Sequence, residues 1–164
     1  MRSAVLKDVL RAVIAVLAAF LLYSSMGELG HAALVIVNGF SVVVIFFAVG
    51  RGEIFGAVLG TSCGLLQDAF SLGVFGVSGL SKTLLGFWTG YVCRRMDTGP
   101  PFRSGVFLLI MSTLELAIWF LINLVVFRER PNVYGGLLFV QPVMTAVLAS
   151  LMLSIRRKIE SRRS

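Results

Sequence analysis

Six long apolar stretches, separated by short segments that contain charged residues, glycine or proline, are the strongest constraint in this sequence. They lie at about residues 9–26, 32–49, 54–71, 74–93, 104–127 and 134–155. A helix needs roughly 20 apolar residues to cross a bilayer, so each stretch has about the length of one span. The sequence therefore predicts an all-α fold: a polytopic membrane protein, with a bundle of six transmembrane helices that forms a single integral membrane domain over residues 1–164.

The composition excludes an ordinary soluble domain. Apolar side chains make up 57% of the 164 residues and charged side chains only 14%, whereas soluble domains have about 45–50% and about 25%. Six spans leave no room for a soluble catalytic domain, and the sequence has no Walker-type loop or His-Glu-x-x-His motif. We therefore expect a non-enzymatic protein without a cofactor.

The lysines and arginines predict the topology, because cytoplasmic segments carry an excess of them. With the N-terminus inside, twelve of the 15 fall in cytoplasmic segments: Arg2, Lys7, Arg11, Arg51, Arg94, Arg95, Arg103, Arg156, Arg157, Lys158, Arg162 and Arg163. Both termini are therefore expected in the cytoplasm. The basic tail, residues 156–164, is interpreted as an anchor on anionic lipids rather than as a nucleic-acid site.

Small residues recur at every fourth position in the third and fourth stretches. The first row continues at the same spacing to Asp68, and in the second row Lys82, Gly86 and Gly90 follow Ser78. Residues four apart share a helix face, and glycines there let a second helix approach closely. We call the first row the glycine ladder; its members are Gly52, Gly56, Gly60 and Gly64. The two rows are expected to face each other or a shared neighbour, and they serve either internal packing or the docking of a partner.

Three ionisable residues, Asp68, Lys82 and Glu115, fall inside predicted spans, where a charge requires a partner or water. At about 1.5 Å per residue, Asp68 and Lys82 differ in depth by a distance that a lysine side chain covers. An Asp68–Lys82 ion pair is therefore the preferred prediction, and Glu115 is the alternative partner of Lys82. The cluster would fix the helices in register, bind a ligand or ion, or couple to protons.

Other polar features have simpler interpretations. Pro142 predicts a kink within the last span. Cys63 and Cys93 lie within spans, so no disulfide is expected. His31 is the single histidine and cannot form a metal site with two cysteines.

The Gly-Val-Ser-Gly segment at residues 76–79 resembles the nucleophile motif of rhomboid intramembrane proteases. A Ser78 nucleophile needs a base, and no histidine follows His31. Lys82 could act as the base only if it were neutral, whereas Asp68 nearby would favour its charged form. The sequence therefore does not favour a protease.

A series of short motifs lies between residues 51 and 95. It consists of an Arg-Gly turn, glycines four apart, a Gly-Leu-Leu-x-Asp segment, a small-residue turn and a Gly-Tyr pair before two arginines. The residues are Arg51, Gly52, Gly56, Gly60, Gly64, Leu65, Leu66, Asp68, Gly73, Gly76, Gly90, Tyr91, Arg94 and Arg95. This series resembles the rod shape-determining protein MreD family, whose length and six spans also match.

The resemblance implies a multi-pass protein of the bacterial cytoplasmic (inner) membrane that belongs to the cell-elongation machinery, the elongasome. It implies a scaffold that regulates cell shape and lateral peptidoglycan synthesis by binding an MreC-like bitopic membrane protein. MreB, RodA and a penicillin-binding transpeptidase would belong to the same complex. The family is not known as an enzyme, and we expect contacts with the phospholipid bilayer and none with nucleic acid.

The resemblance also implies a helix arrangement similar to that of the substrate-binding components of energy-coupling-factor transporters. The alternative function is therefore the binding of a small, vitamin-type molecule in an outward pocket. The predicted outer loops, near residues 27–31, 71–76 and 127–133, are short and poor in hydrogen-bonding side chains. We therefore favour the scaffold over the transporter component.

Overall fold

The structure, a computed structural model, describes residues 2–29, 38–70, 75–95, 101–126 and 137–161. In these ranges the chain forms six α-helices and one 3₁₀-helix. They are α1 (Arg2–Leu29), α3 (Gly39–Arg51), α4 (Glu53–Phe70), α5 (Val77–Arg95), α6 (Pro101–Val126), η1 (Leu137–Val140) and α7 (Gln141–Ser161). The predicted all-α fold is confirmed, and each predicted apolar stretch overlaps one α-helix.

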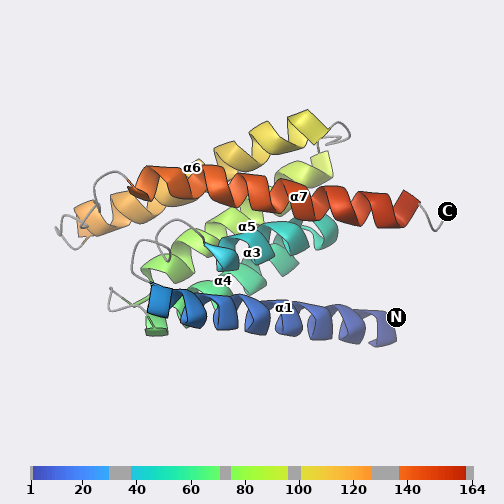
Figure 1. The fold of residues 1–164 in the computed structure, drawn as a ribbon, viewed down its shortest axis with the longest axis horizontal. Helices are drawn as coiled ribbons and strands as arrows, with labels where there is room; N and C mark the ends of the chain where they lie inside the picture. The colour runs from blue at the N-terminus through green and yellow to red at the C-terminus, as the bar shows by residue number, and fades with distance from the viewer. Residues whose placement is uncertain (1, 30–37, 71–74, 96–100, 127–136, 162–164) are drawn as a thin grey trace.

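Helix α3 lies at the centre of the bundle. It packs against α1, α4, α5 and α7, and Figure 1 shows it between α1 and α7. A helix enclosed by four others buries more than one face, and every residue from Phe40 to Ile45 is buried. Phe40, Val44 and Ile45 are at most 1% exposed. Helix α6 packs against α5 and α7.

A single residue, Gly52, joins α3 to α4. Its φ of +91° lies in the left-handed region that favours glycine, and its N–H donates to the Ala48 carbonyl at 2.9 Å. This turn lets α4 fold back against α3. At the other end of α3, the Asn38 side chain caps the helix by accepting from the Ser41 N–H at 3.3 Å.

Both ends of the described chain lie at one end of the bundle, on the right in Figure 1. We call this the terminal end. Contacts between side chains bring the α3–α4 junction and the end of α5 to the same place: Asp8 of α1 pairs with Arg51, and Glu53 of α4 pairs with Arg94 of α5. The arrangement therefore gathers basic residues from four helices at the terminal end.

Polar side chains are buried and many large apolar side chains are exposed. Lys82 is 2% exposed, and Ser41 and Thr89 are fully buried. By contrast, Ile54 of α4 is 75% exposed and Leu21 of α1 is 67% exposed. Within the described residues, Gly105–Val125 of α6 is the one segment that is long and apolar enough by itself to cross a membrane, and Gly39–Arg51 and Gln141–Arg156 are shorter apolar helices.

The predicted kink at Pro142 is wrong, because α7 begins at Gln141 and the proline occupies its first turn. The 3₁₀-helix Leu137–Val140 comes directly before it. Proline is tolerated in the first turn because the N–H that it lacks would have no partner within the helix. The proline therefore marks the start of a helix rather than a bend within one.

Candidate helix-packing and charge-pairing site

Gly56, Gly60 and Gly64, the members of the glycine ladder that belong to α4, lie directly against the backbone of α5. A Cβ atom added at Gly56 would overlap the carbonyl of Gly86, one at Gly60 the carbonyl of Lys82, and one at Gly64 the carbonyl of Ser78. Each step of four residues along α4 therefore matches a step of four in the opposite direction along α5. Only glycine permits this backbone-to-backbone approach.

The second row of small residues faces back in the same way. A Cβ atom at Gly86 would overlap the carbonyl of Gly56, and one at Gly90 would overlap the backbone of Gly52 and Glu53. Helices α4 and α5 accordingly form the most extensive contact between described elements. The sequence left internal packing and partner docking open for these glycines, and the structure uses them inside the α4–α5 pair.

A polar bridge crosses the same interface and was not predicted. The hydroxyls of Thr61 and Thr83 lie 2.7 Å apart, so one donates to the other. Each hydroxyl also lies within hydrogen-bond distance of a carbonyl of its own helix, Thr61 of the Ala57 carbonyl at 2.9 Å and Thr83 of the Gly79 carbonyl at 2.6 Å. Each hydroxyl has one proton, so the threonine that donates across the interface does not also donate to its own helix. Thr61 directly follows Gly60 and Thr83 directly follows Lys82, so a threonine beside each row of small residues was the available sequence signal.

Asp68, at the end of the row that begins with the glycine ladder, caps the start of α5. Its carboxylate accepts from the backbone N–H groups of Gly76 at 2.9 Å, Gly79 at 3.1 Å and Ser78 at 3.3 Å. The first N–H groups of a helix have no partner within it, and the helix dipole favours negative charge there. Gly76 precedes the helix and has no side chain to cap it, so Asp68 of the neighbouring helix supplies the carboxylate.

The preferred Asp68–Lys82 ion pair is wrong, because Lys82 pairs with Glu115 of α6. The distance from Nζ to Oε1 is 2.6 Å. The depth estimate treated Asp68 as a charge that needs a cation, but the N-terminus of α5 supplies three N–H donors at the same level. Lys82 therefore pairs with Glu115, the alternative partner that the sequence also indicated.

The Lys82–Glu115 pair belongs to a buried cluster that joins three helices. Ser41 of α3 donates its hydroxyl to the same Oε1 atom at 2.7 Å. The side chains of Lys82 and Glu115 are 2% and 9% exposed. Charged groups removed from water must be paired and hydrogen-bonded, so the cluster fixes the rotation of α3, α5 and α6 relative to one another.

Two more polar residues of α6 lie on the buried side. Ser112 donates to the Pro142 carbonyl of α7 at 2.9 Å, which joins α6 to the first turn of α7. Asn123 donates to the Trp119 carbonyl at 2.8 Å within α6 itself. The polar residues of α6 therefore face neighbouring helices or its own backbone.

The remaining residues of the MreD-like series have different positions. Gly73 lies outside the described residues. Gly76 has a φ of +99° and open space where a Cβ would lie. Tyr91 stacks on Phe87, with ring centroids 6.1 Å apart, and carries the Arg95 guanidinium 4.7 Å above its ring. Gly90 therefore packs α5 against α4, whereas Tyr91 contacts residues of α5 itself.

Within the described ranges, the side chains that could form a metal site or a disulfide form neither. No group of three or more His, Cys, Asp and Glu side chains is placed to hold a metal ion there. No disulfide joins Cys63 and Cys93, and His31 lies outside the described residues. Ser78 is buried, and its carbonyl accepts from Ser81 at 3.2 Å. The described site is thus one of helix packing and charge pairing.

Comparison with known proteins gives no match to a protein-family model, a curated protein or a solved structure. The resemblance to the MreD family stays a prediction from the residues.

Proposed function

We propose that this chain is a non-enzymatic scaffold of the bacterial inner membrane that acts in cell elongation by binding an MreC-like single-span partner. In this proposal its six helices cross the bilayer, both termini are cytoplasmic, and the terminal end of the bundle faces the cytoplasm. MreB, RodA and a penicillin-binding transpeptidase belong to the wider complex through that partner.

One observation carries the proposal: the described residues between 51 and 95, which bear the resemblance, build a single unit. Gly56, Gly60 and Gly64 allow the close approach of α4 and α5, and Asp68 caps the helix that follows Gly76. Residues far apart in the motif series thus have connected structural roles. The series therefore describes a closely packed helical hairpin, which supports a role in helix packing.

The distribution of polar and apolar side chains supports placement in a bilayer. Lys82, Glu115 and Ser41 satisfy one another in the interior, while large apolar side chains such as those of Leu21 and Ile54 point outward. In a bilayer, exposed apolar side chains meet lipid, and buried polar groups need partners within the protein. The basic residues at the terminal end fit the positive-inside rule.

The close contact of α4 and α5 also restricts where a partner can bind. The ladder glycines are covered by α5, so the partner in this proposal binds to other surfaces of the bundle. Bulky residues in the ladder should then lower the abundance of the protein itself, rather than selectively weaken the partner complex.

The test is affinity purification of the full chain from bacterial membranes in mild detergent, with identification of bound proteins. The proposal expects an MreC-like bitopic protein to co-purify with wild type and with Gly105→Ala, where an added Cβ meets nothing within 4 Å. Gly60→Leu should lower abundance and partner recovery together. Recovery of a vitamin without a bitopic partner, or release of the chain from membranes by alkaline carbonate, would overturn the proposal.

A further inference from the structure

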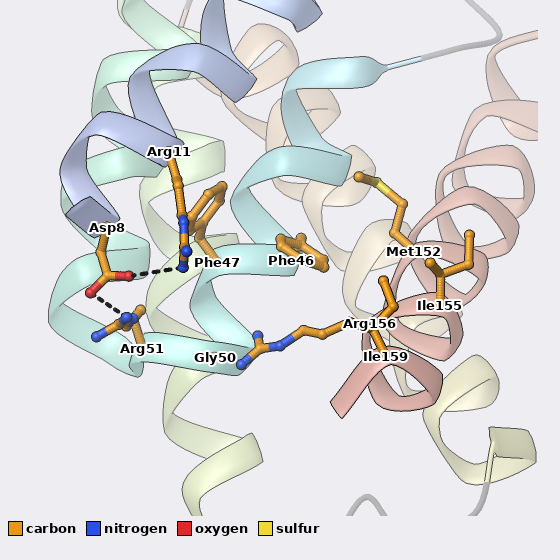
Figure 2. A pocket seen from close by; sticks show the side chains of 10 residues that line it. All are labelled: Asp8, Arg11, Phe46, Phe47, Gly50, Arg51, Met152, Ile155, Arg156 and Ile159. Atoms are coloured by element: carbon orange, nitrogen blue, oxygen red, sulfur yellow. Dashed lines mark ion pairs between the residues drawn. The ribbon is translucent and has the colours of Figure 1, made fainter. Parts of the chain in front are cut away.

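A pocket of about 460 Å³ opens at the terminal end, between α1, α3 and α7. Figure 2 shows the side chains that line it: Asp8 and Arg11 come from α1, Arg51 from the end of α3, and Arg156 reaches across from α7 toward Gly50. Arg51 is the one residue of the motif series that lines this pocket, and no residue of the buried charge cluster lines it. It is therefore separate from the packing site.

Positive charge exceeds negative charge in the pocket. Three guanidinium groups, those of Arg11, Arg51 and Arg156, and one carboxylate, that of Asp8, line it. Asp8 is 8% exposed and pairs with Arg51 and, at 3.8 Å, with Arg11. Arg11 and Arg51 share this one carboxylate, so positive charge exceeds negative charge among these three side chains and the pocket attracts an anion.

Apolar side chains lie beside these charges. The Phe46 ring lies beneath the Arg156 guanidinium, whose carbon is 5.6 Å from the ring centroid, and Met152 and Ile155 of α7 form an apolar wall that is partly exposed. Guanidinium groups match phosphate oxygens in geometry, while exposed apolar side chains favour hydrocarbon. This combination fits an amphiphile better than a free anion.

We propose that the pocket binds an anionic phospholipid, with its phosphate among Arg11, Arg51 and Arg156 and the start of its acyl chains against Met152 and Ile155. The inference rests on the membrane placement in the proposed function, which puts the terminal end at the cytoplasmic leaflet, where anionic lipids carry a negative surface potential. It does not depend on the MreC-like partner.

The test is native mass spectrometry of the full chain in neutral detergent, with equal amounts of phosphatidylglycerol and phosphatidylcholine of the same acyl chains. Wild type should retain phosphatidylglycerol about tenfold better, and Arg156→Gln and Arg11→Gln should each lower that preference about tenfold, the scale of a charge-assisted contact. Arg11 is largely exposed, so its loss should leave the fold intact. Arg95→Gln, outside the pocket at the same end, is the matched control and should keep the preference.

Asp8→Asn should change the retention of phosphatidylglycerol in the direction opposite to the arginine variants. It removes the carboxylate that pairs with Arg51 and Arg11, so retention of phosphatidylglycerol should rise several-fold, about the effect of one removed like charge. If the cluster only holds α1 against α3, the same variant would lower retention or leave it unchanged, and the inference would be overturned.

The remaining outcomes separate this inference from the proposed function. Equal retention of both lipids by a chain that resists carbonate extraction overturns the lipid site alone, whereas a chain washed out of membranes overturns both. Displacement of the lipid by millimolar inorganic phosphate would show a site for free anions and would also overturn it. If Arg95→Gln lowers the preference for phosphatidylglycerol as much as the pocket variants do, the lipid responds to unspecific surface charge, and the inference is overturned.

Discussion

Lys82 of α5 donates to Oε1 of Glu115 of α6 at 2.6 Å, and both side chains are buried. Ser41 of α3 donates to the same oxygen at 2.7 Å. A buried ion pair adds little stability compared with apolar residues of the same volume, because both charges lose their hydration. The pair instead contributes specificity: rotation of α5 or α6 would separate the two charges, and rotation of α3 would remove the Ser41 donor.

Removal of either charge should therefore be more harmful than removal of both. Lys82→Met leaves Glu115 buried without a cation, and Glu115→Met leaves Lys82 without an anion, so each should cost about 3–5 kcal/mol of unfolding free energy. The double variant should cost clearly less than the sum of the two. Unfolding by SDS in mixed micelles would measure all three, and additive losses would contradict the ion pair.

Asp68 should tolerate Asn better than Ala. The Asp68 carboxylate accepts from the N–H groups of Gly76, Ser78 and Gly79, and an amide oxygen can still accept from them, as it does at other helix N-termini. Asp68→Ala should cost about 1–2 kcal/mol, and Asp68→Asn about half of that. The rate of hydrogen exchange at these three amides should rise in both variants, and more in Asp68→Ala than in Asp68→Asn. Equal effects of Asn and Ala would indicate that the charge, rather than the cap, is what matters.

Adding one methyl group should have opposite effects at two glycines. Gly60→Ala places a Cβ against the Lys82 carbonyl and forces α4 and α5 apart, so stability should fall by about 2 kcal/mol or more, as in other overpacked cores. Gly105→Ala in α6 meets nothing within 4 Å and should gain up to about 1 kcal/mol from helix propensity. Thermal unfolding in detergent would compare them, and similar shifts would contradict the close approach of α4 and α5.

The sequence predicted the helices and the face of the α4–α5 contact because both follow from spacing along one chain. Four-residue spacing identifies neighbours on a helix whatever surrounds it, so the spacing alone identifies the faces that carry Gly56, Gly60 and Gly86. Helix number followed from the length of apolar segments in the same way.

The partners of the buried charges could not be predicted in the same way. Depth along a helix is set by residue number, but the direction in which Lys82 points relative to α6 depends on how the helices rotate in the bundle. The backbone donors that bind Asp68 could not be predicted either, because the N–H groups near Gly76 are available to it only where α5 begins. The Asp8–Arg51 pair was missed because it joins α1 to the end of α3, far apart in sequence.

Gly76 should be sensitive to substitution for a reason unlike that at Gly60. No atom lies within 4 Å of a Cβ added there, but its φ of +99° strains any residue with a side chain. Gly76→Ala should therefore cost about 1 kcal/mol, and Gly76→Val more, because β-branched residues tolerate positive φ least. The distance between spin labels at the exposed positions Val58 and Trp88 on α4 and α5 should stay unchanged in Gly76→Ala and increase in Gly60→Ala. An increase in both would show that Gly76 also serves close packing, against the open space that surrounds it.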